Sequence, residues 1–333
     1  MQPRLSDDRE TTVAPVIEGI ERRFPHRYFD PGLLESAKAG RRISVCIPAR
    51  NEESTVRAVV DPIVAELTHR RGGIPLVDEV LVVDDGSSDD TADRARQSGA
   101  KVVTTGSGRG AGSGGKGQAM RLALEVAEGD LIAFVDADVT NFGAHFVTGL
   151  LGPLVLDPTT TLVKGYYRRP LHDAPDGGGR VTELVAKPLI DLLFPALDGI
   201  VQPLAGESAA PRSVLEACGL ADGYSVELAL LIDVASRFGA GTIAQVDLGT
   251  RVHRNRPLAE LRPQATEILR MALARAELGR TELGRTELGR AELGRAELGR
   301  AELGRAELGR TELGRTELGR AELDPADRPG SGA

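Results

Sequence analysis

Three apolar runs in the first half of the chain each end in a cluster of polar residues, and this recurrence restricts the fold more than any other feature. The runs are residues 43–48 (ISVCIP), 78–83 (DEVLVV) and 131–139 (LIAFVDADV). Helical segments alternate with them at residues 54–69, 92–98 and 118–127, and residues 101–104 form a further strand. Because right-handed crossovers join parallel strands, this alternation predicts an α/β fold with a mostly parallel sheet. Ligands of such sheets bind at the carboxyl ends of the strands, where the polar clusters lie.

The third run ends in two carboxylates one residue apart, Asp136 and Asp138. Because alternate side chains of a strand share a face, we expect both carboxylates to point the same way at the edge of the sheet. Oxygen ligands of this kind suit Mg²⁺ or Mn²⁺ held against a diphosphate. An isolated Asp-x-Asp is more often a strand end that faces water. The polar clusters after Ile47 and Val83 favour the metal site.

A glycine-rich segment, residues 106–117 (GSGRGAGSGGKG), carries Arg109 and Lys116. It nearly matches a phosphate-binding P-loop, but Gly117 stands where that motif has the Ser or Thr that contacts Mg²⁺. We therefore expect a mobile loop that brings Lys116 to a phosphate. A plain flexible linker remains an open alternative.

The second half of the chain, with strands expected at residues 161–168 and 244–248, contains three further polar groups. Residues 177–182 combine glycines with Arg180 and Thr182 just before a helix, which suits an anion. Glu227 lies in the first turn of a helix predicted to end at Phe238, although a residue that only complements the helix dipole is commoner there. Residues 251–256 (RVHRNR) surround His253 with cations, so a metal or phosphate role is at least as well supported as a structural one.

Composition and charge exclude several classes of protein. The formal net charge of −8 and the pI near 5.4 argue against a general nucleic-acid binder, which needs a basic face. Cys46 and Cys218 are typical of core residues in a reducing compartment and not of a disulfide framework. The first ten residues lack the apolar core of a signal peptide, and Lys, Asp and Pro interrupt the apolar stretch at residues 184–204. We expect a cytoplasmic protein with no membrane span.

Residues 276–320 repeat a five-residue unit, AELGR or TELGR, nine times. On a helix each step of five residues rotates Leu by about 140°, so the leucines form no seam and a coiled coil is excluded. Each Gly costs about 1 kcal/mol inside a helix, partly offset by Glu–Arg pairs. We therefore expect a marginal helix or a disordered tail at residues 276–333. The repeat also resembles pentapeptide-repeat β-solenoids, but a solenoid of this length would have too few coils.

A series of short motifs occurs in one order: PARNEE, VVDDGSSDDT, GKG, FVDADV, GGGRVTEL, QPLAGE, GYSVE and HRNRPL. Over about residues 29–257 the chain therefore resembles the glucosyl-3-phosphoglycerate synthases of actinobacteria. The first four motifs alone indicate a nucleotide-sugar glycosyltransferase of the GT-A type, and GGGRVTEL and HRNRPL narrow the resemblance to this family and its mannosyl relatives. The resemblance implies a Rossmann-like GT-A fold and a retaining transfer of glucose from UDP-glucose to 3-phosphoglycerate. It also implies Mg²⁺, or Mn²⁺, and a homodimer.

The resemblance further implies an organisation of the chain and roles for individual residues. Residues 1–40 would be an N-terminal arm and helix, 41–140 the nucleotide-sugar half, 141–275 the acceptor half of the same domain, and 276–333 the repeat tail. Pro48, Ala49, Arg50, Glu52 and Asp85 would line the uridine, with Lys116 near the diphosphate. Asp136, Ala137 and Asp138 would form the Asp-x-Asp motif, with Asp138 and His253 on the metal. Leu204, Tyr224, Glu227 and Arg251 would surround the sugar as catalytic residues, and Gly179, Arg180, Thr182 and Asn255 would hold the acceptor's phosphate and carboxylate.

Three positions depart from the usual pattern of the family. Arg50 stands where the family often has an aliphatic residue, Asp85 where Ser is common, and Ala137 lies between the aspartates. Their effect would fall on the choice of donor.

The expected chemistry depends on neutralising the diphosphate that leaves. The metal, Lys116 and Arg251 would offset its developing charge electrostatically. The sequence shows no carboxylate pair of the glycosidase type, so a front-face attack is expected, with Glu227 orienting the sugar.

Four alternatives stay open. A mannosyl-3-phosphoglycerate synthase would use GDP-mannose, and base discrimination rests on a few loop contacts. A polyprenyl-phosphate glycosyltransferase would need an apolar groove or membrane-binding segment, and a sugar nucleotidyltransferase would normally have a glycine-rich loop where this chain has PARNEE. A non-catalytic nucleotide-sugar-binding module lies outside the enzymes, and the two aspartates, Lys116 and His253 argue against it.

Overall fold

The computed structural model describes residues 22–69, 75–105, 115–170, 179–252 and 261–279 of the chain. The chain divides into two compact units, Met1–Arg275 and Ala276–Ala333. His253, Asn255, the glycine-rich segment before Gly115 and the repeat tail from residue 280 onward lie outside the described residues. The expectations for these segments, and for the domain boundaries, stay predictions.

The described part of the first unit contains an eight-stranded sheet in the order β1-β8-β6-β7-β5-β2-β3-β4. The strands are β1 (Arg23–Pro25), β2 (Ile43–Ala49), β3 (Glu79–Asp84), β4 (Lys101–Thr104), β5 (Leu131–Phe134), β6 (Leu162–Arg168), β7 (Ser208–Pro211) and β8 (Ile243–Thr250). Neighbouring strands are parallel except at β7, which runs antiparallel to both β5 and β6. The prediction of a mostly parallel α/β sheet is confirmed.

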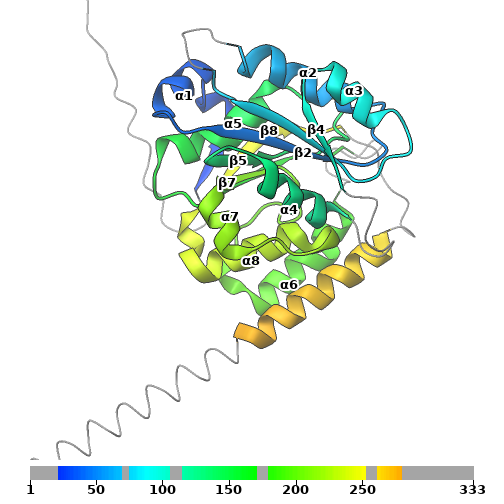
Figure 1. Cartoon of the computed structure of the whole chain (residues 1–333). Coiled ribbons are helices and arrows are strands. Elements are labelled where there is room, and N and C mark those ends of the chain that lie inside the picture. The colour runs from blue at the N-terminus through cyan, green and yellow to red at the C-terminus, as the bar shows by residue number, and fades with distance from the viewer. Residues whose placement is uncertain (1–21, 70–74, 106–114, 171–178, 253–260, 280–333) are drawn as a thin grey trace, which may run out of the picture. The chain divides into compact units, whose positions relative to one another are not determined.

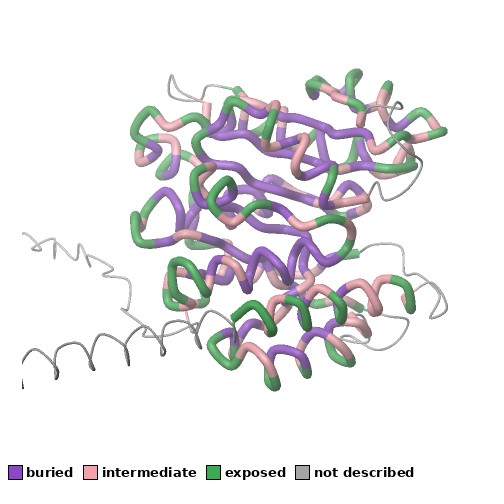
Figure 2. Tube along the Cα trace, turned by 60° about the horizontal axis from the view of Figure 1, so that its bottom comes forward, coloured by how far each residue is buried: buried purple, intermediate pink, exposed green. Residues whose placement is uncertain are grey.

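Helices cover both faces of this sheet (Figure 1). They are α1 (Pro31–Ala37), α2 (Val56–Leu67), α3 (Thr91–Gln97), α4 (Lys116–Val126), α5 (Ala144–Leu156), α6 (Lys187–Leu193), α7 (Arg212–Cys218) and α8 (Val226–Phe238), followed by a helix over residues 261–279. One core joins α1, α2, α3 and α5 to the sheet, and a second core joins α4, α6, α7, α8 and helix 261–279 to it. Alternate residues of β5 enter the two cores, Ala133 the first and Ile132 the second. The centre of the sheet is therefore buried on both faces (Figure 2).

The strand that carries the Asp-x-Asp motif is shorter than its apolar run predicted. β5 ends at Phe134, and the pairing of both neighbours with β5 ends there too, opposite Cys46 of β2 and Ser208 of β7. Asp136 and Asp138 therefore follow the strand, at the start of a turn. The expectation that strand alternation aligns these two carboxylates is wrong.

Helix α4 begins earlier than predicted. Its first residue is Lys116, and Gly115 precedes it with a φ of 124°, a conformation that glycine adopts readily. A Cβ atom on Gly117 would collide with the carbonyl oxygen of Ala221, so glycine lets the start of α4 pack against the chain before α8. Lys116 is held by a helix, and the prediction that it lies in a mobile loop is wrong.

Several elements of the second half were not predicted from the sequence. They are β7, α5, α7 and helix 261–279. β7 has only four residues and is antiparallel, so it interrupts the alternation of strands and helices on which the prediction depended. None of the described helices is long and apolar enough to cross a membrane. The cytoplasmic location stays a prediction.

Candidate active site

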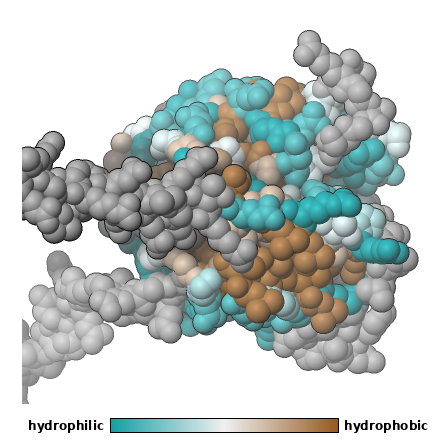
Figure 3. Space-filling view, turned by 90° about the horizontal axis from the view of Figure 1, so that it is seen from below, coloured by the Kyte–Doolittle hydropathy of each residue, from teal (hydrophilic) through white to brown (hydrophobic). Residues whose placement is uncertain are grey.

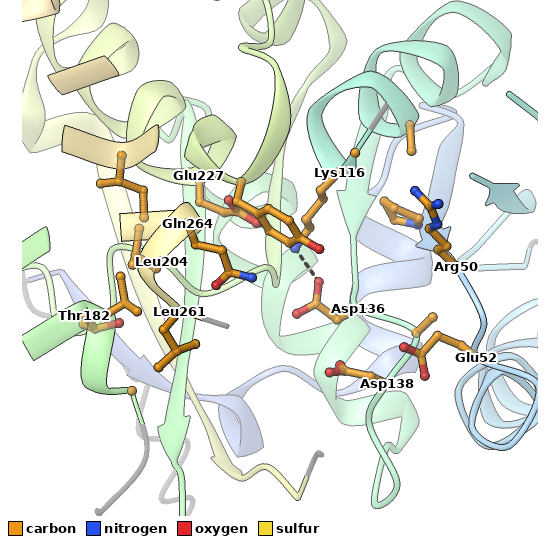
Figure 4. Close-up of a pocket in the computed structure, with 18 of the residues that line it drawn as sticks. Arg50, Glu52, Lys116, Asp136, Asp138, Thr182, Leu204, Glu227, Leu261 and Gln264 are labelled. Carbon is orange, nitrogen blue, oxygen red and sulfur yellow. Dashed lines mark hydrogen bonds and ion pairs between the residues drawn. The ribbon is translucent and has the colours of Figure 1, made fainter. Parts of the chain in front are cut away.

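A pocket of about 440 Å³ lies at the carboxyl ends of the strands, and its volume falls in the range of small-molecule sites. Residues at the end of β2 and after β2, β3 and β5 line one side. Residues after β6, before and within α8, and in helix 261–279 line the other. Every predicted site residue within the described ranges lines this pocket, and Figure 4 shows part of the lining. They are Pro48, Ala49, Arg50, Glu52, Asp85, Lys116, Asp136, Ala137, Asp138, Gly179, Arg180, Thr182, Leu204, Tyr224, Glu227 and Arg251.

Asp85, the first residue after β3, connects three segments at one end of the pocket. Its Oδ1 accepts a hydrogen bond from the Thr105 hydroxyl at 3.0 Å, and its Oδ2 accepts one from the Gly115 backbone N–H at 3.1 Å. Nη1 of the largely exposed Arg50 lies 3.7 Å from Asp85 Oδ2. Figure 4 places Arg50 and Glu52 together, on the opposite side of the aspartates from Thr182. This end therefore offers a fixed carboxylate and an adjustable cation to a polar ligand.

Lys116 joins the aspartate motif to α8. It forms ion pairs with Asp136 and, at 2.7 Å, with Oε1 of Glu227 (Figure 4). Burial alone would lower the pKa of Lys116, but the charges of Asp136 and Glu227 outweigh burial and raise that pKa. Burial would raise the pKa of Asp136, but the charges of Lys116 and Arg251 lower it well below its ordinary range. A Cβ atom on Gly206 would collide with both Lys116 and Asp136, so this ion pair requires glycine there.

Glu227 occupies the first turn of α8. The sequence left open whether it only complements the helix dipole or belongs to the site, and the structure distinguishes between the two. Its exposed fraction is only 7%, and its carboxylate pairs with Lys116. A residue that only complements the helix dipole would be expected to face water. Glu227 is instead part of the pocket's charge network, next to the short η4 helix (Gly223–Ser225) that carries Tyr224.

Arg251 follows β8 and is only 4% exposed. Its Nη2 donates to Asp136 Oδ2 at 2.8 Å and to Asp138 Oδ1 at 2.5 Å, and its Nη1 donates to the Tyr167 hydroxyl at 2.7 Å. Both carboxylates of the motif therefore converge on one nitrogen atom although they lie beyond the strand. The contact of Arg251 with a diphosphate, which the sequence suggested, stays a prediction.

Asp136 and Asp138 have the chemistry that a Mg²⁺ or Mn²⁺ site needs. Such ions are commonly held by one or two carboxylates together with phosphate oxygens of the substrate. The side chain of Asp138 is 32% exposed, so a ligand can reach its oxygens. Within the described ranges no group of three or more His, Cys, Asp or Glu side chains is placed to hold an ion, and His253 lies outside those ranges.

The opposite end of the pocket carries the predicted anion cradle. Figure 4 shows Thr182, Leu204, Leu261 and Gln264 grouped across the pocket from Arg50. Gly179 has a φ of 79°, and a helix begins at Arg180 and continues through the π-helical turn η2 (Thr182–Ala186) into α6. Backbone N–H groups at this helix start and the Arg180 guanidinium together suit an anion.

Some residues of the pocket were not predicted: Gly115, Ala119, Arg169, Val181, Leu261, Gln264 and Ile268. Arg169 directly follows β6, so the rule that polar residues collect after strand ends could have found it. Helix 261–279 carries no motif. Its apolar residues Ile268 and Ala272 are buried in the second core, which is the signal of a packed helix and not of a binding site.

Comparison with known proteins bears on the identity of this pocket. A family model described as glycosyl transferase family 2 matches residues 44–175. The glucosyl-3-phosphoglycerate synthase of Mycolicibacterium smegmatis is 47% identical over 249 residues, which cover 73% of this chain and 80% of that protein. A crystal structure of the Mycobacterium tuberculosis glucosyl-3-phosphoglycerate synthase with Mn²⁺, UDP-glucose and phosphoglyceric acid is 45% identical. It aligns with a TM-score of 0.68 over 74% of this chain and 84% of that one. Another, with Mg²⁺ and UDP, is 42% identical with a TM-score of 0.69 over 78% and 87% of the two chains.

Proposed function

Because the chain belongs to the glucosyl-3-phosphoglycerate synthase family, we propose that it transfers glucose from UDP-glucose to the hydroxyl group of 3-phosphoglycerate with retention of configuration. The observation that carries this proposal is a pocket with two chemically different ends. The aspartates and Lys116 lie toward one end, and the cradle at residues 179–182 lies at the other. A sugar diphosphate and an anionic acceptor need two such ends side by side.

The donor occupies the end beside β2 and β3. Pro48, Ala49, Arg50, Glu52 and Asp85 line the uridine. Lys116 has three N–H donors, of which Asp136 and Glu227 take two, so its third can reach the diphosphate.

The proposed ion is Mg²⁺, with Mn²⁺ as a substitute that accepts the same oxygen ligands. Asp138 and His253 would hold it, and when bound it would supply a positive charge that offsets the charge on the diphosphate. Arg251 fixes one oxygen of Asp138 at 2.5 Å, so the orientation of this carboxylate is set by the protein itself.

Positioning, and not covalent catalysis, explains the arrangement of the carboxylates. Asp136 and Glu227 are both paired with Lys116, and a carboxylate held by an ammonium group is a weaker nucleophile than a free one. The acceptor hydroxyl therefore attacks the anomeric carbon from the face that the diphosphate leaves, the bond from that carbon to the diphosphate breaks, and the hydroxyl proton passes to the departing diphosphate. Glu227, Leu204, Tyr224 and Arg251 surround and orient the sugar. Gly179, Arg180, Thr182 and Asn255 hold the acceptor.

A panel of donors and acceptors tests this function. UDP-glucose and GDP-mannose are each combined with 3-phosphoglycerate and with glycerate, in Mg²⁺ and after chelation by EDTA, and the products are separated by mass. We expect transfer from UDP-glucose to 3-phosphoglycerate in Mg²⁺ and loss of transfer after chelation. Preference for GDP-mannose would identify a mannosyl enzyme, and donor binding without any transfer would identify a binding module.

The homodimer is part of the same proposal. Leu184 in η2, Leu192 in α6 and Leu269 and Leu273 in helix 261–279 are 75, 79, 40 and 51% exposed. These elements lie at the bottom of Figure 1, and the view from that side shows a large apolar area (Figure 3). An exposed apolar area of this kind is typical of an interface, and a second copy of the chain would bury it.

Light scattering after size exclusion tests the dimer. Leu192→Asp should convert it to a monomer, because a charge in an apolar interface is left without a partner. Leu33→Asp is the matched control, since Leu33 is 49% exposed on α1, outside this surface. A dimer that survives Leu192→Asp would contradict the assignment of the interface.

A further inference from the structure

Arg169 lines the pocket but has no assigned role. Its guanidinium carbon lies 4.9 Å from the centre of the Tyr167 ring, and its Nη2 donates to the Tyr167 hydroxyl at 2.8 Å. A Cβ atom on Gly179 would lie 3.8 Å from Arg169 Nη1. The guanidinium is thus fixed beside the first residue of the acceptor cradle.

Tyr167 can hold Arg169 in place because its own hydroxyl group is held by the buried Glu207. Tyr167 is 3% exposed and donates its only hydroxyl hydrogen to Oε2 of the fully buried Glu207 at 2.7 Å. Its oxygen therefore accepts from both Arg169 and Arg251, at 2.8 and 2.7 Å. One hydroxyl group sets two arginines side by side, one directed at the aspartate motif and one at the acceptor cradle.

The two arginines differ in what balances their charge. Arg251 pairs with Asp136 and Asp138, whereas Arg169 forms no ion pair with a carboxylate of the described residues. Arg169 is half-buried and lines the pocket. An anionic ligand can therefore reach the Arg169 guanidinium group and balance its charge.

The acceptor has two anionic groups, a carboxylate and a phosphate, and they lie at different distances from the reacting hydroxyl. This difference indicates which of the two Arg169 binds. In 3-phosphoglycerate the carboxylate is attached to the carbon that carries the reacting hydroxyl, and the phosphate lies one carbon further away. Arg169 shares the Tyr167 hydroxyl with Arg251, and Arg251 donates to Asp136 and Asp138, so Arg169 lies beside the residue that contacts the aspartate motif. Arg180 belongs to the cradle itself, further along the chain at the start of its helix.

We propose that Arg169 binds the carboxylate of the acceptor and leaves the phosphate to the cradle around Arg180. This inference rests on the proposed function, since it takes 3-phosphoglycerate as the acceptor. A planar guanidinium forms two parallel hydrogen bonds with a carboxylate, so Arg169 selects acceptors with an acidic group next to the reacting hydroxyl. Tyr167 and Glu207 are positioning residues for this contact.

Calorimetric titration in the presence of UDP and Mg²⁺ separates the two anions. The ligands are 3-phosphoglycerate and glycerol 3-phosphate, which keeps the phosphate but lacks the carboxylate. In the Arg169→Gln variant, 3-phosphoglycerate should bind about 10- to 100-fold more weakly, and glycerol 3-phosphate should change by less than about 3-fold. Equal weakening of both ligands, or no change in either, would overturn the assignment.

Arg168→Gln is the matched control. It removes the same charge one residue earlier, at an exposed position of β6 outside the pocket, and should change neither titration. Equal weakening by this variant would show an effect of net charge and would also overturn the assignment. Arg169→Lys keeps the charge without the fork and should lose part of the selectivity; it replaces Arg169→Gln if that variant does not fold.

The proposed function fails separately from this inference. If the wild-type chain transfers no glucose to 3-phosphoglycerate, the function is wrong. If it transfers glucose normally and Arg169→Gln shows no loss selective for the carboxylate, only the role of Arg169 is wrong.

Discussion

The donor end and the acceptor end of the pocket are built in different ways. The donor end takes its residues from the ends of β2, β3 and β5, which are neighbouring parallel strands whose carboxyl ends must meet. The acceptor end takes its residues from the end of β6, the start of the helix at residues 180–193, and helix 261–279. The donor end therefore follows from the order of strands in the sheet. The acceptor end depends on helices that are distant in the chain and pack against one another.

The two ends also differ in their charge balance. Near the donor end Lys116 pairs with Asp136 and Glu227, and Arg251 pairs with Asp136 and Asp138. Near the acceptor end Arg169 has a hydroxyl group and an aromatic ring for neighbours. Internal ion pairs hold the donor end in shape before a ligand binds, and a cation without a carboxylate favours an anionic ligand at the acceptor end.

The largest effect is expected at the donor end, from Asp138→Ala. Loss of a charged group that acts on the diphosphate should lower turnover by at least about 100-fold, while the melting temperature should fall only slightly, because the buried Arg251 keeps its ion pair with Asp136. Turnover and melting are measured on the same sample at saturating Mg²⁺. Asp61→Ala, at an exposed position of α2, is the control. Unchanged turnover in Asp138→Ala would contradict the assignment of Asp138 as a ligand of the metal ion.

The next effect is expected at the acceptor end, from Arg180→Ala. It should raise the Michaelis constant for 3-phosphoglycerate by about 10- to 100-fold, because charge-assisted hydrogen bonds to the acceptor are lost. Arg180→Lys should recover only part, since an ammonium group lacks the fork of a guanidinium. The constant for UDP-glucose should not move. A rise for UDP-glucose alone would mean that the two ends are exchanged.

A smaller effect that reaches both ends is expected from Tyr167→Phe. This change removes the hydroxyl group that fixes Arg169 and Arg251, so the Michaelis constants for both substrates should rise, each by about 3- to 10-fold. Tyr166→Phe is the control, because Tyr166 is outside the pocket. If only one of the two constants rises, Tyr167 does not link the ends.

The same contrast explains what the sequence could predict. Asp85 and the aspartate motif were found because polar residues follow apolar strands, a local pattern that needs no knowledge of packing. The pairing of Asp136 and Asp138 was expected for the wrong reason: they converge through Arg251, which is 113 residues away from Asp138 in the chain. Arg180 was found by its glycine-rich context. Leu261 and Gln264 have no such context, because only the packing of their helix brings them to the pocket.

Lys164 permits a test by pH in the strand that carries Tyr167. It is 2% exposed, its ammonium group donates to the Ala205 carbonyl at 2.5 Å, and burial lowers its pKa from the ordinary 10.5 to about 8. Between pH 8 and 10.5 the unfolded chain therefore binds the proton more strongly than the folded one. Stability from this group should rise with pH across that window, because the cost of a buried charge disappears as the folded state loses its proton.

The Lys164→Met variant should lack this rise in stability with pH, because methionine carries no titratable group. Relative to wild type it should be stabilised by roughly 1–3 kcal/mol below pH 8, and the difference should shrink toward pH 10. Melting curves of both proteins across this range provide the measurement. A difference that stays constant with pH would mean that Lys164 does not titrate in the folded state within this window.

The smallest effect is expected from removing the repeats. Comparison with a shorter chain then shows which C-terminal residues belong to the acceptor end. A chain shortened to residues 1–279 keeps helix 261–279 and should retain turnover and both Michaelis constants within about two-fold, since the leucines of the repeats form no apolar face that could pack against a core. A chain shortened to residues 1–260 is the matched comparison. It loses Leu261 and Gln264 from the pocket, Ile268 from the second core, and the Arg275–Asp233 ion pair at 2.7 Å.

This second shortening should therefore lower the melting temperature and raise the constant for 3-phosphoglycerate more than the constant for UDP-glucose, because helix 261–279 lines the acceptor end and not the donor end. Measured together, the two shortened chains locate the boundary between site and tail within residues 261–279. If removal of residues 280–333 already weakens the acceptor, the repeats contribute to the site. If removal of residues 261–333 weakens both substrates equally, the helix supports the whole pocket and the two ends are not separately built.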